Sequence, residues 1–353
     1  MLSPRPALVG RARRTRRRAA VAVSLLLAAG CATVRNYEDP VQPVYAGGSP
    51  AGDRGGQTLR VVTFNLKWGR HVDRAAVLLS RPGPLRDADL VVLQEMDPAG
   101  TERLARALGV SYVYVPSAVH PVPKQDFGVA LLSPWPLEEP RKLLLPHQHR
   151  FRKLRRAAAV ATLRSPLGPV RVYGIHFESP AGAWDRVRRD QGQAVLADAA
   201  GWAGPVVVAG DFNGRAGPQV LASAGFSWPT EKVKNTAGPF DFDHILARGL
   251  CPAGPGSAGV ALDATDASDH DPVWAELTPC PASPTAAAVC TAPGCGRAPD
   301  APSAGEPPSA PRRAVPRETR SRRDAAASGR RPGEPTPPGA GASGSSWTSR
   351  RAG

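Results

Sequence analysis

The central part of the chain, residues 58–278, is a series of short apolar runs that are separated by turn residues. Several runs alternate apolar and polar residues, which is the period of a half-buried strand. Residues 205–210 instead read PVVVAG, which is typical of a strand that is buried on both faces. We predict strands within residues 59–66, 89–96, 112–116, 127–133, 157–163, 170–179, 205–210, 240–247 and 271–277.

Helical patterns lie between some of these runs. We expect helices over residues 73–80, 100–108 and 183–202, of which the last is longer and amphipathic. The segment is long enough to bury a substantial core and has no internal repeat. Strands mixed with helices in this way predict an α/β fold in which two packed sheets are covered by helices.

Residues 1–31 have the pattern of an export signal. An arginine-rich segment precedes the apolar stretch AAVAVSLLLAAGC, which is too short to span a bilayer and ends in small residues. The LLLAAGC end resembles the lipobox of bacterial lipoproteins, which implies that Cys31 is acylated and anchors the protein to a membrane outside the cytoplasm. The alternative is an ordinary secretory signal in which Cys31 is incidental.

The segments on either side of the central domain differ from it in composition. Residues 32–57 are rich in Pro, Gly and polar residues, and we expect a flexible tether. Residues 279–353 are rich in Ala, Pro, Gly, Ser and Arg, and we expect a disordered tail. Residues 1–50 and 279–353 each carry +6 of the net charge of +15, so the high pI says little about the folded part.

The cysteines suit an exported protein, in which disulfides are permitted. Cys251 with Cys280 is placed to close the end of the domain, and Cys290 with Cys295 is placed to close a small loop. The sequence leaves this connectivity open. No spacing of Cys and His indicates zinc.

Polar side chains that can bind metal ions or transfer protons lie at or near the ends of six predicted strands. Strand ends at one edge of a sandwich converge in space even when they are far apart in the sequence. Carboxylates, amides and imidazoles that converge can bind a divalent cation, transfer protons and contact phosphate oxygens. These residues are Asn65, Glu95, His176, Glu178, Asp211, Asn213, Asp243, His244, Asp269, His270 and Asp271.

In chain order, the motifs VVTFNL, VVLQEM, FGVALLS, GIHFES, GDFN, FDHIL and SDHDPV resemble those of the endonuclease/exonuclease/phosphatase superfamily. Its members include pancreatic deoxyribonuclease, abasic-site endonucleases, neutral sphingomyelinases and inositol polyphosphate phosphatases. The resemblance covers residues 59–277. It implies a four-layered α/β sandwich, in which two mostly antiparallel sheets face each other with helices outside, and a metal-dependent hydrolase of phosphoric esters.

The resemblance also implies roles for individual residues. Glu95 matches the main ligand of Mg²⁺ or Mn²⁺, assisted by Asn65, and Asp269 matches a carboxylate on the metal side of the site. The roles of the other matched residues concern water, phosphate and proton transfer.

Asp211 matches the residue that orients or deprotonates the attacking water, and Asn213 matches a neighbour that holds water and phosphate. His270 matches the imidazole that contacts the scissile phosphate, and Asp243 matches the carboxylate that pairs with it. His176 stands where deoxyribonuclease-like members carry a second histidine, and Asp126 is placed to pair with it.

The substrate is left more open than the chemistry. Residues 146–158 read PHQHRFRKLRRAA, in which five cations surround Phe151, and such a loop can bind a phosphate backbone or be a solvated surface. Arg155 or Arg156 is placed to reach the site. Nucleic acid is the leading substrate, with phospholipid or inositol phosphates as alternatives. A non-catalytic, membrane-tethered binding module is a further alternative to an enzyme. We expect the protein to be a monomer.

Overall fold

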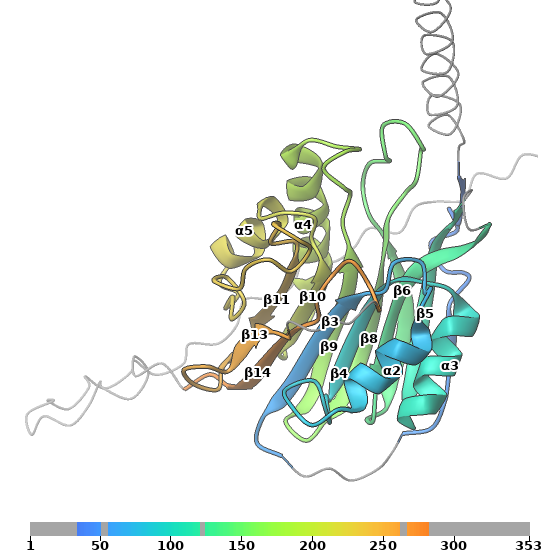
Figure 1. Cartoon of the computed structure of the whole chain (residues 1–353). Helices are drawn as coiled ribbons and strands as arrows, with labels where there is room; N and C mark the ends of the chain where they lie inside the picture. Colours follow the sequence, from blue (N-terminus) through green and yellow to red (C-terminus); the bar gives the residue numbers. More distant parts are fainter. Residues whose placement is uncertain (1–33, 51–55, 121–123, 262–266, 282–353) are drawn as a thin grey trace, which may run out of the picture. The chain divides into compact units, whose positions relative to one another are not determined.

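The computed structural model describes residues 34–50, 56–120, 124–261 and 267–281. Within them, two sheets lie face to face (Figure 1). The larger sheet has nine strands, in the order β1-β5-β6-β4-β3-β14-β12, with β2 paired to β5 and β13 paired to β14. Its strands are β1 (Arg35–Asn36), β2 (Tyr45–Gly47), β3 (Leu59–Asn65), β4 (Leu90–Met96), β5 (Ser111–His120), β6 (Gln125–Ser133), β12 (Leu250–Pro252), β13 (Ala258–Val260) and β14 (Val273–Pro279).

The smaller sheet has five strands in the order β11-β10-β9-β8-β7. Their bounds are β7 (Leu137–Leu144), β8 (Ala157–Ser165), β9 (Gly168–His176), β10 (Val206–Asp211) and β11 (Asp243–Arg248). The pairs β3–β4 and β9–β10 are parallel, and the other pairs of named strands are antiparallel. Two mostly antiparallel sheets are therefore present, as predicted.

Four layers result from where the apolar faces are buried. Side chains such as Val92, Val172 and Ala209 fill the space between the sheets. Helices α2 (Val72–Ser80) and α3 (Pro98–Leu108) pack on the outer face of the larger sheet, and α4 (Asp185–Ala199) and α5 (Ala216–Ser223) pack on the outer face of the smaller one (Figure 1). The predicted α/β sandwich is confirmed.

Strand β7 and helix α5 are among the elements that the sequence pattern did not predict, and the short strands β1, β2, β12 and β13 are the others in the described residues. Strand β7 contains Pro140, which removes a ladder donor and argues against a central strand, but β7 is the last strand of its sheet and its register shifts between Glu138 and Arg141. Helix α5 contains Gly217 and Pro218, and the proline is tolerated because it lies in the first turn. Both elements were missed for these reasons.

The chain before the central domain is not the flexible tether that we predicted. Strands β1 and β2 pair with β5, so residues 34–47 belong to the larger sheet. Buried Lys142 donates from Nζ to the carbonyl oxygens of Asp39 at 3.0 Å and Gln42 at 2.6 Å. Tyr37 Oη donates to Asp126 Oδ1 at 2.7 Å. The tether prediction is wrong for these residues.

The predicted Cys251–Cys280 disulfide is present and joins β12 to the residue that follows β14. Cys290, Cys295, the predicted signal with Cys31, and the predicted tail beyond residue 281 lie outside the described residues. Within the described part of the chain, no helix has both the length and the apolar character needed to cross a membrane.

Candidate active site

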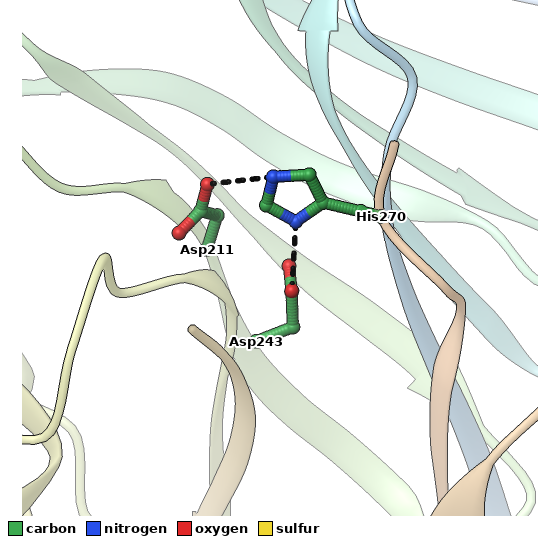
Figure 2. Close-up of side chains that lie close together, drawn as sticks. All are labelled: Asp211, Asp243 and His270. Atoms are coloured by element: carbon green, nitrogen blue, oxygen red, sulfur yellow. Dashed lines mark hydrogen bonds and ion pairs between the residues drawn. The ribbon is translucent and has the colours of Figure 1, made fainter. Parts of the chain in front are cut away.

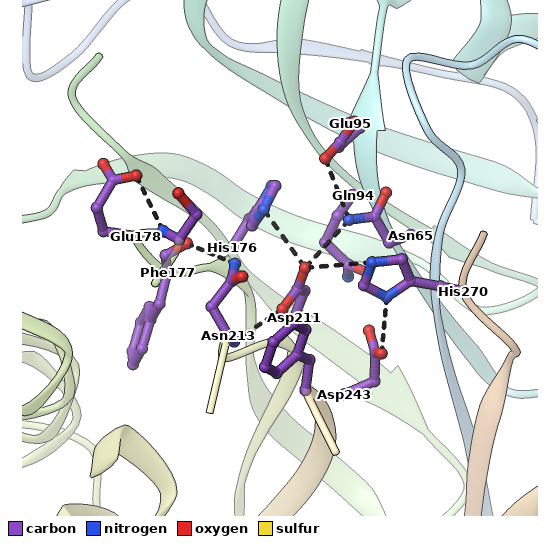
Figure 3. A network of polar contacts seen from close by, with 12 residues as sticks. Asn65, Gln94, Glu95, His176, Phe177, Glu178, Asp211, Asn213, Asp243 and His270 are labelled. Atoms are coloured by element: carbon purple, nitrogen blue, oxygen red, sulfur yellow. Dashed lines mark hydrogen bonds and ion pairs between the residues drawn. The ribbon is translucent and has the colours of Figure 1, made fainter. Parts of the chain in front are cut away.

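The candidate site lies where strand ends from both sheets meet (Figure 3). In the smaller sheet, Asp211 is opposite His176 on β9 and opposite Asp243 on β11. In the larger sheet, Asn65 at the end of β3 is opposite Gln94, next to Glu95. Asn65 joins the two sheets because its Nδ2 donates to Asp211 Oδ2 at 3.1 Å and to Glu95 Oε1 at 3.3 Å.

Gly210 allows the close approach of β9 and β10 at the site. Its φ is +151°, and a Cβ there would lie 2.0 Å from the carbonyl oxygen of Ile175. A side chain at this position would therefore push β10 away from β9, together with Asp211 and His176. The glycine of the GDFN motif thus has a structural reason that is separate from the chemistry of its neighbours.

His270 lies between two carboxylates (Figure 2). Its Nδ1–H donates to Asp243 Oδ2 at 2.8 Å, and its Nε2 lies 3.9 Å from Asp211 Oδ2. Burial of the imidazole lowers its pKa, but the charge of Asp243 and this hydrogen bond outweigh burial and raise the pKa of His270 to about 10. The imidazole is therefore protonated at neutral pH, as the predicted Asp243–His270 pairing requires.

Thr236 holds Asp243 in place and was not found from the sequence. Its Oγ1–H donates to Asp243 Oδ2 at 2.8 Å, and Thr236 Oγ1 in turn accepts the backbone N–H of Asp243 at 3.1 Å. No short motif marks this threonine, which lies in a loop seven residues before the carboxylate that it contacts. Asp243 Oδ1 is buried, and no described residue donates a hydrogen bond to it.

Asp211 is at the centre of the contacts. The backbone N–H of Asn213 donates to its Oδ1 at 2.8 Å, and Asn213 Nδ2 donates to the carbonyl oxygen of Phe177 at 3.0 Å. Burial, followed by the charge of Asp243, raises the pKa of Asp211 to about 7. A carboxylate with a raised pKa and one oxygen aimed at the site is suited to accept a proton near neutral pH.

Glu95 is turned toward a cavity by an irregularity in β4. The register of β4 with β6 shifts between Gln94 and Met96, and Glu95 has a φ of +59°. Such bulges re-aim a side chain and are frequent beside active sites. The cavity has a volume of about 240 Å³, and its lining includes Glu95, Lys67, Arg152, Asp269 and His270.

The residues around Glu95 fit a divalent cation. Burial raises the pKa of Glu95, and the only hydrogen bond that the described residues give its carboxylate is the one from Asn65. A half-buried carboxylate that accepts one hydrogen bond from a neutral partner is open to the cavity, so a cation there would stabilise it. Asn65 Oδ1 accepts the backbone N–H of Lys67 at 3.0 Å, so Asn65 bridges carboxylates rather than turning its oxygen to the cavity.

Asp269 and the group of Asp211, Asp243 and His270 are two further positions at which a cation could bind. Asp269 lines the same cavity, but its Oδ2 is ion-paired with Lys67 Nζ at 2.8 Å. Asp211, Asp243 and His270 could also hold a metal ion, since each offers a ligand atom within 4.8 Å of the others. Because His270 is protonated by its pairing with Asp243, Glu95 is the better position for a cation.

His176 is brought to the site, but not by Asp126. Arg156 Nη1 donates to His176 Nδ1 at 2.9 Å, so the ring proton is on Nε2, which lies 3.5 Å from Asp211 Oδ2 (Figure 3). Burial and the charge of Arg156 hold the pKa of His176 well below its usual value. The predicted Asp126–His176 pair is wrong, because Asp126 is engaged by Tyr37.

We predicted that Arg155 or Arg156 would reach the site, and Arg156 is the one that does. Its side chain is buried, and Nη2 lies 3.5 Å from Glu178 Oε1. Arg155 instead pairs with Glu38 at 2.9 Å. His244 faces away from the catalytic contacts, with Nε2 bonded to the carbonyl oxygen of Asp241 and its ring against Trp228.

Comparisons with known proteins identify the family of the chain. The sequence model of the endonuclease/exonuclease/phosphatase family matches residues 62–270. A protein of Klebsiella pneumoniae (strain 342), called UPF0294 protein, is 27% identical over 262 residues, which cover 68% of this chain and 88% of that protein.

Among the solved structures that share the fold are two from bacteria. An endonuclease/exonuclease/phosphatase from Beutenbergia cavernae is 20% identical, with a TM-score of 0.51 over 64% of this chain and 72% of that chain. Another from Bacteroides vulgatus is 15% identical, with a TM-score of 0.50 over 64% of this chain and 100% of that chain. Since the family match spans more than half of the sequence, the chain belongs to the endonuclease/exonuclease/phosphatase family of phosphoester hydrolases.

Proposed function

We propose that this protein is a divalent-metal-dependent phosphodiesterase that works outside the cytoplasm. The observation that carries the proposal is the position of the Asp211–His270–Asp243 group beside the cavity that Glu95 lines. These groups supply a base, a protonated imidazole and a buried carboxylate at one place. A base that accepts a proton from water and a cation that stabilises charge on a phosphoryl oxygen both accelerate the hydrolysis of a phosphoric ester, and the buried carboxylate keeps the imidazole protonated.

The reaction is an in-line attack of water on phosphorus. Asp211 accepts a proton from the water as the new P–O bond forms and the ester P–O bond breaks. His270 donates from Nε2 to a phosphoryl oxygen and stabilises the charge that develops there, and the departing oxygen takes a proton from solvent. Burial and the charge of Arg156 keep His176 neutral, so it donates a hydrogen bond through Nε2 and does not act as the acid.

Glu95 would hold the cation, which we propose to be Mg²⁺ or Mn²⁺, with Asp269 beside it. The hard oxygen donors of carboxylates suit these ions. The cation would supply Lewis acidity and neutralise charge on the phosphoryl group. Asn65 would keep the Glu95 and Asp211 carboxylates at a fixed separation.

Export and anchoring remain part of the proposal. The Cys251–Cys280 disulfide supports a compartment outside the cytoplasm, because such bonds persist in oxidising surroundings. Acylation of Cys31 would attach the protein to a membrane. Replacing Cys31 by Ser is expected to release the protein from the membrane fraction without changing its rate of hydrolysis, whereas continued attachment would contradict the lipid anchor.

The activity is tested with the full chain, because residues 34–47 are part of the folded domain. The substrates are bis-p-nitrophenyl phosphate, plasmid DNA, RNA, sphingomyelin and inositol phosphates, each with Mg²⁺ or Mn²⁺. We expect hydrolysis that EDTA abolishes and that His270→Ala lowers by about 10²-fold or more. A folded protein that hydrolyses none of them would favour a non-catalytic binding module.

A further inference from the structure

Two of the most exposed aromatic side chains stand next to the candidate site. Trp184 is 77% exposed and Phe151 is 57% exposed. Trp184 directly precedes α4, on the loop that leaves β9 after His176, so this loop starts at the catalytic edge of the sheet. Phe151 lies on the loop between β7 and β8, which extends beyond the strand ends together with the first loop (Figure 1).

The two loops are joined and enclose an apolar hollow. The backbone N–H of Arg150 donates to the carbonyl oxygen of Gly182 at 3.1 Å. Phe151, Trp184, Pro180 and Val187 contribute to the lining of a cavity of about 440 Å³. A Cβ at Gly182 would lie 2.1 Å from the ring of His149, which also lines the catalytic cavity, so the hollow and the site are neighbours.

Only two of the five cations of the basic loop are exposed on its surface. Arg155 pairs with Glu38, Arg156 is buried against His176, and half-buried Arg152 lines the catalytic cavity beside His120. The exposed cations of the loop are Arg150 and Lys153, on either side of Phe151. Exposed aromatic rings flanked by a few cations suit the headgroup region of a bilayer. A phosphate backbone would be better matched by a continuous row of free cations.

The N-terminal end of the described chain meets the same loop. The backbone N–H of Val34 donates to the carbonyl oxygen of Arg152 at 3.1 Å, and Asn36 Nδ2 donates to the carbonyl oxygen of Lys153 at 2.8 Å. Only two residues separate Cys31 from Val34 in the sequence. An acyl group on Cys31 would therefore tether the chain close in sequence to the segment that contacts this loop.

We infer that Phe151 and Trp184 dock on a phospholipid bilayer and that the catalytic cavity faces its headgroups. The aromatic rings enter the headgroup region, while Arg150 and Lys153 meet lipid phosphates. The substrate would then be a phosphoester at the membrane surface. That assignment rests on the proposed function, whereas the docking itself does not.

Tryptophan fluorescence tests the docking. The full chain with Cys31→Ser, in EDTA, is mixed with vesicles of phosphatidylglycerol and phosphatidylcholine brominated on its acyl chains, which quench a tryptophan that enters the bilayer. We expect Trp184→Phe to remove most of the quenching and Phe151→Trp to increase it. Trp202→Phe is the matched control, since Trp202 follows the other end of α4, about 23 Å along the helix, and its loss should not change the quenching.

The outcomes separate docking from catalysis. Quenching that is unchanged in Trp184→Phe and not increased in Phe151→Trp overturns the docking, whatever the rate on bis-p-nitrophenyl phosphate. Binding to single-stranded DNA that Trp184→Ser and Phe151→Ser weaken together, with no binding to vesicles, would also overturn it and favour nucleic acid. Quenching as expected without hydrolysis of any phosphoester would leave the docking standing and remove the proposed function.

Discussion

At the scale of single residues, the charge state of His270 depends on Asp243. The imidazole is protonated below a pKa of about 10, and its protonated form is lost as the pH rises through that value. In Asp243→Asn the neighbouring charge is gone while burial still lowers the pKa. We expect the alkaline fall of the pH–rate profile to move to lower pH, and the rate at pH 8 to drop by about 10²-fold.

A nearby carboxylate provides the control for this change. Asp241 is two residues from Asp243, and its Oδ2 pairs with Lys234 Nζ at 2.7 Å. Asp241→Asn should leave the alkaline limb where it is. An alkaline limb in Asp243→Asn that matches the wild type would show that the carboxylate does not set the protonation of His270.

The placement of Asp211, Asp243 and His270 could be predicted because each stands in a short motif at the end of a strand. The partner of His176 could not be predicted in the same way. Asp126 directly precedes the FGVALLS motif. Its carboxylate, however, accepts a hydrogen bond from Tyr37, which lies in a segment that we expected to be flexible. The choice of Arg156 over Arg155 depends on which side chain points into the site just before β8, and the run of basic residues hides that alternation.

At the scale of elements, Lys142 on β7 fixes the segment that contains β1 and β2. Its ammonium group donates charge-assisted hydrogen bonds to the backbone carbonyl oxygens of Asp39 and Gln42 in that segment. Lys142→Met should lower the free energy of unfolding by about 1–2 kcal/mol. It should also speed hydrogen exchange at residues 35–47. Urea unfolding and exchange measured by mass spectrometry would show both effects, and exposed Lys153→Met is the control.

Unchanged exchange at residues 35–47 in Lys142→Met would mean that strand pairing alone holds the segment.

The strands of the core could be predicted because their apolar runs are long and regular. The segment of β1 and β2 could not, since its strands are two and three residues long and gain their stability from β5 and Lys142 rather than from an apolar pattern.

At the scale of the whole domain, the disulfide and the candidate active site lie at opposite ends of β14. The site is near Val273, where β14 begins, and Cys280 follows Pro279, where it ends, so about 23 Å of strand separates them. The disulfide closes a loop with a sequence separation of 29 residues, which restricts the unfolded chain and stabilises the fold by about 3–4 kcal/mol. Replacing Cys251 and Cys280 by Ala should remove this stabilisation, and the rate on bis-p-nitrophenyl phosphate at 25 °C should stay within about twofold of the wild type. Reductant should lower the urea midpoint of the wild type to that of the variant and leave the variant unchanged. A large loss of rate in the folded variant would show that the far end of β14 positions His270.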